Sequence, residues 1–236
     1  MNAHMKREKP KFDSDEDLAQ VVTGHGPCTY LLLSLLGLIL IFPYAKGEFL
    51  GRALPAILYS LVLIGGAYAI SWNSRRLIIG SGLALLGITL QWTALLTDIG
   101  VIYRLASVSY VVILILTIGE VFRYILRKGP VTADKLHGAL AGYIMIAFLW
   151  TFIYALIESF TPGSFTLEKV YSADDPHAFY RLLYFSFTTL TTAGYGDITP
   201  VTDQARSFVM IEQFSGVFFV GILIARLAGL YPPQKI

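Results

Sequence analysis

The sequence predicts an all-α membrane protein with six transmembrane helices and a re-entrant helix and loop between the fifth and the sixth. Only 14% of the 236 residues are charged and 55% are hydrophobic, whereas soluble domains average about 25% charged residues. Six apolar runs approach or reach the roughly 20 residues that a helix needs to cross the hydrocarbon of a bilayer. The interval between the last two runs is too long for a simple turn.

The expected spans divide the chain into three parts. They cover residues 29–44, 53–72, 77–96, 105–126, 139–160 and 205–230. Residues 1–27 are polar and mixed in sign, which predicts a flexible cytosolic tail. Residues 28–128 then form a four-helix transmembrane domain of unknown role. A Gly129-Pro130 breaker separates it from a second domain, residues 129–236, which holds the last two spans and the long interval.

The basic residues predict the orientation of the spans. With the N-terminus inside, twelve lysines and arginines lie on the cytosolic side and six lie outside. This excess follows the positive-inside rule and predicts that both termini are cytosolic. The formal net charge of +2 gives no reason to expect nucleic-acid binding. The four histidines are scattered without the spacing of metal ligands, so no metalloenzyme site is expected.

The long interval predicts a short helix followed by an extended loop. Asp175 is a favourable N-cap and Pro176 suits the first helical position. Residues 178–191 then read as one helix of about 14 residues, or about 21 Å. This length is too short to cross the membrane and return, so the helix is expected to be re-entrant and surrounded by protein. Its C-terminal end carries the negative end of the helix dipole.

The segment after this helix is Thr192-Ala193-Gly194-Tyr195-Gly196-Asp197. Gly194 and Gly196 adopt positive φ at little steric cost, whereas the residues between them do not. Alternating conformations along an extended run turn successive carbonyl oxygens to the same side. Four copies around an axis would stack these oxygens in rings, with the Thr192 hydroxyl adding a layer. Such rings replace the water shell of a monovalent cation.

This segment and its flanking helices resemble the pore domain of potassium channels, over about residues 139–231. The resemblance implies a K+ selectivity filter formed by Thr192, Ala193, Gly194, Tyr195 and Gly196. It also implies passive conduction of K+ without catalysis, by a homotetramer surrounded by the lipids of a cell membrane, here a prokaryotic inner membrane. Ala193 departs from the family, which often has Val, and this change is expected to alter packing behind the filter rather than ion chemistry.

The resemblance also suggests residues that support or move the filter. Tyr184 lies where a pore-helix aromatic of the family bonds the aspartate after the filter, here Asp197. Glu212 lies about 10 Å inside the last span and is expected to bond the preceding helix near Thr188 or Thr189, or to be a purely structural group.

Two glycines of the last span are candidate hinges for gating. Gly216 falls where potassium channels bend the inner helix, and Gly221 is a second candidate. The alternative is that a glycine here only permits close helix packing.

Voltage sensing of the usual kind is not expected. It needs several basic residues that move through the membrane field. The fourth span carries Arg104 at its outer end and Arg123 and Arg127 at its inner end. Glu120 is the one charge between them, and it is expected to pair with Arg123 at i,i+3.

Two other functions stay open at this stage. One is a weakly selective monovalent cation channel. The other is a membrane sensor or transporter subunit whose loop only resembles a filter.

Overall fold

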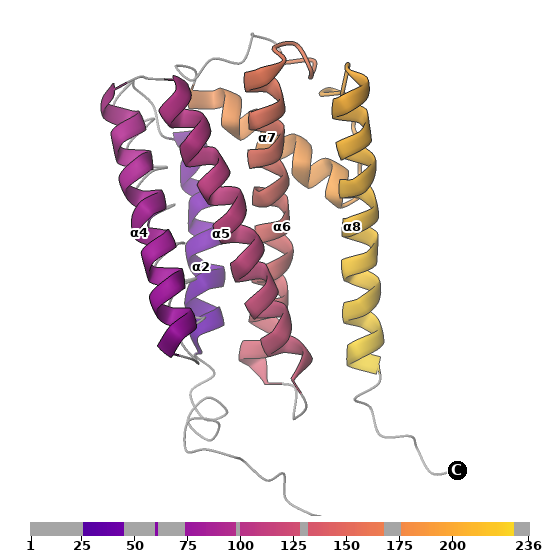
Figure 1. Ribbon diagram of the computed structural model, residues 1–236. Coiled ribbons are helices and arrows are strands. Elements are labelled where there is room, and N and C mark those ends of the chain that lie inside the picture. The colour runs from indigo at the N-terminus through magenta and orange to yellow at the C-terminus, as the bar shows by residue number, and fades with distance from the viewer. Residues whose placement is uncertain are drawn as a thin grey trace, which may run out of the picture.

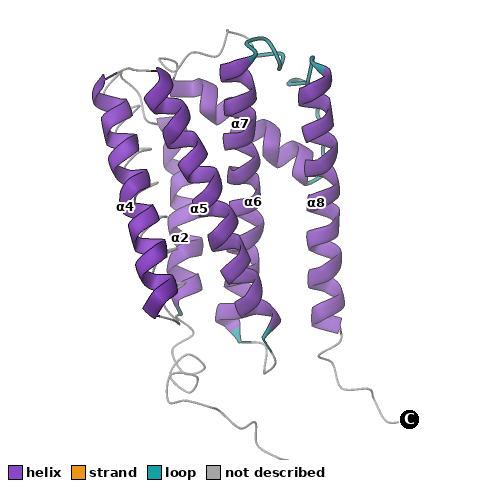
Figure 2. Cartoon of the chain, viewed as in Figure 1, coloured by secondary structure: helices purple, strands orange, loops and turns teal. Residues whose placement is uncertain are grey.

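The computed structural model describes residues 26–44, 60, 74–97, 100–127, 132–167 and 176–228. These residues form helices and loops (Figure 2). Strand pairing among them is limited to one isolated antiparallel bridge between Phe165 and Pro200. The helices are α2 (Pro27–Ile41), the 3₁₀ turn η1 (Phe42–Tyr44), α4 (Ser74–Thr97), α5 (Gly100–Leu126), α6 (Ala133–Phe160), α7 (Pro176–Leu190) and α8 (Asp203–Ala228).

Five of the six expected spans coincide with helices. The second, residues 53–72, lies outside the described residues except for Ser60, as does the expected N-cap Asp175. Helix α6 begins six residues before the expected span, at Ala133. The earlier start has a local cause, because the Thr132 side chain caps the helix by accepting the backbone N–H of Lys135 at 3.3 Å.

Three described helices have the length and composition to cross a membrane. They are α5, α6 and the 203–226 part of α8, with mean hydropathies of 2.2, 2.1 and 2.0. The apolar stretches Pro27–Ile41 and Ala84–Ala94 are shorter than a full span. The described chain is therefore an all-helical, multi-pass membrane protein.

The helices form a bundle with α7 set across it (Figure 1). Helices α4, α5, α2 and α6 run roughly alongside one another, and α8 lies at the opposite edge. The shorter α7 runs obliquely to them and packs against both α6 and α8. The first turns of α2 and α6 lie near the last turns of α5 and α8, at the lower end of the bundle in Figure 1.

Two apolar clusters hold this arrangement, and α6 contributes to both. One joins α6 to α2 and α5, with Leu31, Leu35, Leu38, Tyr110, Met145 and Phe148 at its centre. The other joins α6 to α7 and α8, with Ala147, Tyr154, Phe165, Leu182, Phe185 and Leu190. The most apolar window of α6 is 67% buried, against 22% for α8. Helix α6 is thus the central element, and α8 exposes most of its surface.

Candidate functional site

The segment after α7 has an alternating backbone conformation. Thr192, Gly194 and Gly196 have φ of 60°, 52° and 81°, in the left-handed region. Ala193 and Tyr195 between them are not among the residues with positive φ. The expected alternation therefore begins at Thr192. A β-branched residue in this region is a genuine outlier, and such strained conformations cost on the order of 1–3 kcal/mol each and cluster at functional sites.

The last turn of α7 holds the start of this segment. The N–H of Thr192 donates to the carbonyl of Thr189 at 3.0 Å, and the N–H of Gly194 donates to the carbonyl of Thr188 at 3.0 Å. These carbonyls are among the four that a helix leaves unpaired at its C-terminus. The loop thus takes its bonds from the helix end, which connects the strained conformation directly to α7.

Residues 191–197 are exposed on the single chain. The Tyr195 side chain is 73% exposed, and a Cβ added at Gly194 or Gly196 would meet nothing within 4 Å. Irregular backbone at membrane depth is tolerated only when protein buries it or when it lines a water-filled cavity. The described residues of this chain do not bury the loop.

Tyr184 on α7 lies beside the loop, as the sequence suggested. Its side chain forms a hydrogen bond with Asp197, and its ring stacks on Tyr195 with centroids 6.4 Å apart and planes 11° apart. The neighbouring Phe185 instead fills space between Tyr154 and Phe165, with centroids 5.5 Å from each. The two adjacent aromatic residues of α7 thus differ in their contacts: Tyr184 bonds a polar group of the loop, and Phe185 packs among apolar rings.

The exit of the loop is tied to the segment that follows α6. Glu158 is 1% exposed, and its carboxylate accepts the N–H of Gly163 at 2.6 Å and that of Phe165 at 3.1 Å. Phe165 in turn pairs with Pro200 in the isolated bridge. This arrangement fixes both ends of the loop, since α7 holds its start.

A buried polar network lies behind the loop and joins three helices. Glu212 of α8 is fully buried, and its carboxyl oxygens bond to the hydroxyls of Tyr154 on α6 and Ser186 on α7. Ser215 and Trp150 extend the network, because the Trp150 indole donates to the Ser215 hydroxyl at 3.2 Å and that hydroxyl donates to the Glu212 carbonyl at 2.7 Å. Glu212 therefore contacts α7 as expected, but through Ser186 rather than Thr188 or Thr189.

The Ser186 hydroxyl connects Glu212 to the backbone of α6. The Ser186 hydroxyl lies within bonding distance of both Glu212 and the carbonyl of Ala147, the latter at 2.9 Å. One hydroxyl proton satisfies one acceptor. If Glu212 carries a proton and donates it to Ser186, then Ser186 donates to Ala147 and every group is paired. An ionised Glu212 would accept from Ser186 instead, and the Ala147 carbonyl would still accept the Thr151 hydroxyl at 2.7 Å, so both forms of Glu212 leave these groups paired.

Gly216 and Gly221 have different surroundings on a helix that runs without interruption. A Cβ at Gly216 would lie 2.3 Å from the carbonyl oxygen of Leu190, the last residue of α7, whereas one at Gly221 would meet nothing within 4 Å. The same Leu190 carbonyl accepts the hydroxyl of Tyr143 at 3.1 Å. Gly216 therefore lets α8 approach the end of α7, which is the close-packing alternative for this residue.

The basic residues of α5 are engaged at its ends. The Arg104 guanidinium donates to the carbonyl of Ser159 at 2.8 Å and lies 4.8 Å from the centroid of the Phe160 ring. Arg123 pairs with Glu120, as the i,i+3 spacing predicted. Arg104 thus caps the C-terminal end of α6.

Sequence reasoning did not single out Tyr154 or Ser186. Both side chains are fully buried and contact Glu212. A signal for Ser186 exists, since it is a polar residue between Phe185 and Phe187 on an otherwise apolar face. Tyr154 carries no such signal among the many aromatic residues of α6.

Residues 139–231 match the ion channel family. The match spans α6, α7, the 191–197 loop and the described part of α8, which confirms the predicted potassium channel pore-domain resemblance.

Several curated potassium channels are similar to about two fifths of the chain. "Two pore potassium channel c" of Oryza sativa subsp. japonica is 40% identical over 93 residues, which are 39% of this chain and 18% of the relative. "Voltage-gated potassium channel Kch" of Escherichia coli K12 is 35% identical over 97 residues, 41% of this chain and 21% of the relative. "Calcium-gated potassium channel TvoK" of Thermoplasma volcanium is 28% identical over 95 residues, 40% and 26% respectively.

The chain spans about a fifth to a quarter of the length of these relatives. No solved structure matches the chain.

Proposed function

We propose that the protein is a potassium-selective channel in which four copies of the chain surround one pore. The observation that carries this proposal is the alternation of left-handed residues at Thr192, Gly194 and Gly196. A left-handed residue at every second position turns successive carbonyls to one side of the strand. Rings of such carbonyls are the means by which potassium channels replace the hydration shell of the ion.

The geometry of the loop supports a tetramer. One chain supplies one strand, whereas a dehydrated K+ ion needs oxygen ligands on all sides. The exposure of residues 191–197, together with that of α8, leaves on each copy the surfaces that neighbouring copies and the pore would cover. Conduction is passive, and K+ is the transported ion rather than a resident cofactor.

The membrane arrangement is proposed with both termini in the cytosol of a prokaryotic cell. The lower end of the bundle in Figure 1, where α2 begins and α8 ends, is then the cytosolic end. The 191–197 loop lies toward the outside. Residues 28–128 form a scaffold without a voltage sensor of the usual kind, since Arg104 is held at the end of α6.

Asp197, Tyr184 and Glu212 support the filter in this proposal, and Gly221 is a candidate hinge. Tyr184 holds Asp197 at its outer end. Glu212 holds α7 through Ser186, and α7 in turn carries the first bonds of the filter. Gly221 is the freer of the two candidate hinges, because a side chain there meets no neighbour, whereas Gly216 is packed against Leu190.

A flux assay in liposomes tests the proposal. The purified protein is expected to pass K+ and Rb+ and to exclude Na+ and Li+. Gly194→Ala places a Cβ where φ is +52° and is expected to reduce flux by at least about 100-fold, since the strained backbone must change. Gly82→Ala is the control, because a Cβ at this position of α4 meets nothing within 4 Å.

The outcomes separate the candidate functions. Equal passage of Na+ and K+ would favour the weakly selective cation channel. A monomeric mass in mild detergent, together with no cation flux, would favour a sensor or transporter subunit.

A further inference from the structure

A second buried acidic residue lies far from the filter, at the lower end of the bundle. Asp134 is in the first turn of α6 and is only 2% exposed. Its Oδ1 accepts the N–H groups of Cys28 at 3.0 Å and Thr29 at 3.2 Å, and its Oδ2 accepts the hydroxyl of Tyr124 at 2.9 Å. We name Asp134 with Cys28, Thr29 and Tyr124 the Asp134 clasp.

The clasp caps α2 with a side chain from another helix. Cys28 and Thr29 belong to the first turn of α2, where backbone N–H groups have no partner within their own helix. A carboxylate at this end is also favoured by the helix dipole. A cap normally comes from the residue before the helix, which here is Gly26, a residue without a side chain. The first turn of α2 is therefore bound to α6, more than 100 residues further along the chain.

Gly26 shows how closely the two helices meet. A Cβ at this position would lie 2.2 Å from the Cγ of Asp134. The hydroxyl of Thr29 also lies 2.8 Å from the Nδ1 of His137, which adds a second contact between α2 and α6. A small change at Gly26 thus displaces the Asp134 carboxyl group without altering α6 itself.

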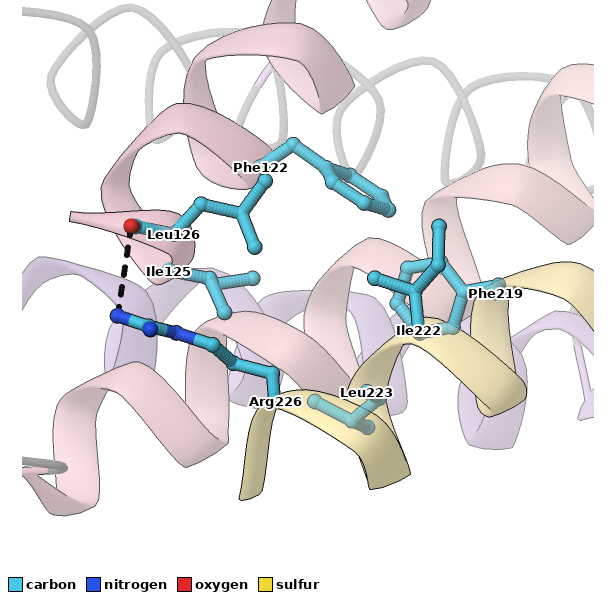
Figure 3. A pocket seen from close by; sticks show the side chains of 7 residues that line it. All are labelled: Phe122, Ile125, Leu126, Phe219, Ile222, Leu223 and Arg226. Carbon is cyan, nitrogen blue, oxygen red and sulfur yellow. Dashed lines mark hydrogen bonds between the residues drawn. The ribbon is translucent and has the colours of Figure 1, made fainter. Parts of the chain in front are cut away.

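The last turn of α5 connects this clasp to α8. Tyr124 of α5 bonds Asp134, and two residues later the carbonyls of Leu126 and Arg127 accept the Arg226 guanidinium of α8 at 3.4 and 2.9 Å. Figure 3 shows Arg226 reaching from α8 to Leu126, past an apolar crevice lined by Phe122, Ile125, Phe219, Ile222 and Leu223. Arg226 therefore ties the end of α8 to the same helix end that Tyr124 ties to α2.

We propose that Asp134 couples the first turn of α2 to the last turn of α8, so that the position of α2 influences whether the pore conducts. This inference rests on the proposed function. The contacts form one continuous path: α2, Asp134, the end of α5, and Arg226. Each link is a hydrogen bond that is either made or broken, and coupling between distant sites travels through such discrete contacts. Arg226 lies in the last turn of α8, so its bonds to the end of α5 bear directly on the position of that end of the helix.

The test compares flux in liposomes among variants at both ends of this path. Asp134→Asn replaces one acceptor oxygen by an NH₂ group, Gly26→Ala pushes the carboxyl group away, and Arg226→Gln removes the bond to α5. Each is expected to change the K+ flux by at least about fivefold, the lower end of typical allosteric couplings, and in the same direction. The double variant Asp134→Asn/Arg226→Gln is expected to match the larger single effect, because both changes break one path.

Matched controls distinguish this coupling from general damage. Gly37→Ala alters α2 where a Cβ meets nothing within 4 Å, and Asp203→Asn alters an exposed acidic residue in the first turn of α8. Both are expected to conduct like the wild type. Tyr124→Phe removes one bond of the clasp but leaves the cap of α2 intact, which provides a milder variant should Asp134→Asn fail to assemble.

Hydrogen exchange measures the clasp without reference to ion flux. The amides of Cys28 and Thr29 are expected to exchange faster in Asp134→Asn than in the wild type. Wild-type flux in every clasp variant, or fully additive effects in the double variant, would overturn the inference and leave the proposed function intact. Absence of K+ flux through the wild type would overturn the proposed function and the gating role of Asp134 with it. Unchanged hydrogen exchange of the Cys28 and Thr29 amides in Asp134→Asn would overturn the cap of α2 by Asp134, and the path from α2 to α8 that depends on it.

Discussion

The 191–197 loop and the network around Glu212 meet through α7 but are built in opposite ways. The loop is exposed and strained, and a Cβ added at either of its glycines would meet nothing within 4 Å. The network is fully buried, and its hydroxyl and carboxyl groups find partners in one another. A strained conformation persists when its surroundings over-determine it. The buried network fixes α7, and α7 supplies the bonds that hold the loop.

The glycines of the two regions show the same difference. Gly194 and Gly196 are needed for their backbone conformation, because their φ values are positive and the space around them is open. Gly216 is needed for a contact, because its missing side chain leaves room for the Leu190 carbonyl. Gly216 therefore has a packing role in this chain, and the hinge role that its position suggests stays a prediction.

The largest effect on the buried region is expected from Glu212→Ala. This change leaves the Tyr154 hydroxyl buried without its acceptor and opens a cavity, at a cost of roughly 2–4 kcal/mol. The measurement is the Tm of the purified protein in detergent. Glu212→Gln is the matched variant: it keeps an acceptor for Tyr154 and a donor for Ser186, so it is expected to remain close to the wild type. A Tm for Glu212→Gln as low as that of Glu212→Ala would mean that Glu212 is ionised.

A somewhat smaller loss is expected from Gly216→Ala. The added methyl group collides with the backbone of Leu190 and forces α7 and α8 apart, and such overpacking typically costs about 1–3 kcal/mol. Stability and K+ flux are both expected to fall. Gly221→Ala provides the comparison, since it meets no neighbour and is expected to keep its stability. Equal stability losses at the two positions would contradict the packing role of Gly216.

The smallest effect is expected from Tyr184→Phe. The ring can still stack on Tyr195, but the hydrogen bond to Asp197 is lost at an exposed site, so the Tm is expected to change little. The outer end of the filter loses a tether, and macroscopic K+ currents are expected to decay faster. Identical current decay in the variant and the wild type would show that the bond does not support the filter.

The sequence predicted the elements that depend on local chemistry. Apolar runs located α2, α4, α5, α6 and α8, since a helix in lipid must satisfy its own backbone groups and present apolar side chains. The expected helix 178–191, with Pro176 at the first helical position, located α7 to within two residues. Gly194 and Gly196 predicted an alternating backbone. The alternation starts two residues before Gly194, at Thr192, which also has a positive φ.

Only the tertiary structure decided which distant groups meet. Helical spacing placed Glu212 inside the membrane, yet its partner proved to be Ser186, because the angle at which α7 crosses α8 selects which residue faces it. Nothing near Asp134 in the sequence indicated that it caps α2. Hydrophobic pattern and backbone preference are properties of short segments, whereas a hydrogen bond between helices depends on their packing angle and depth, which the whole core sets together.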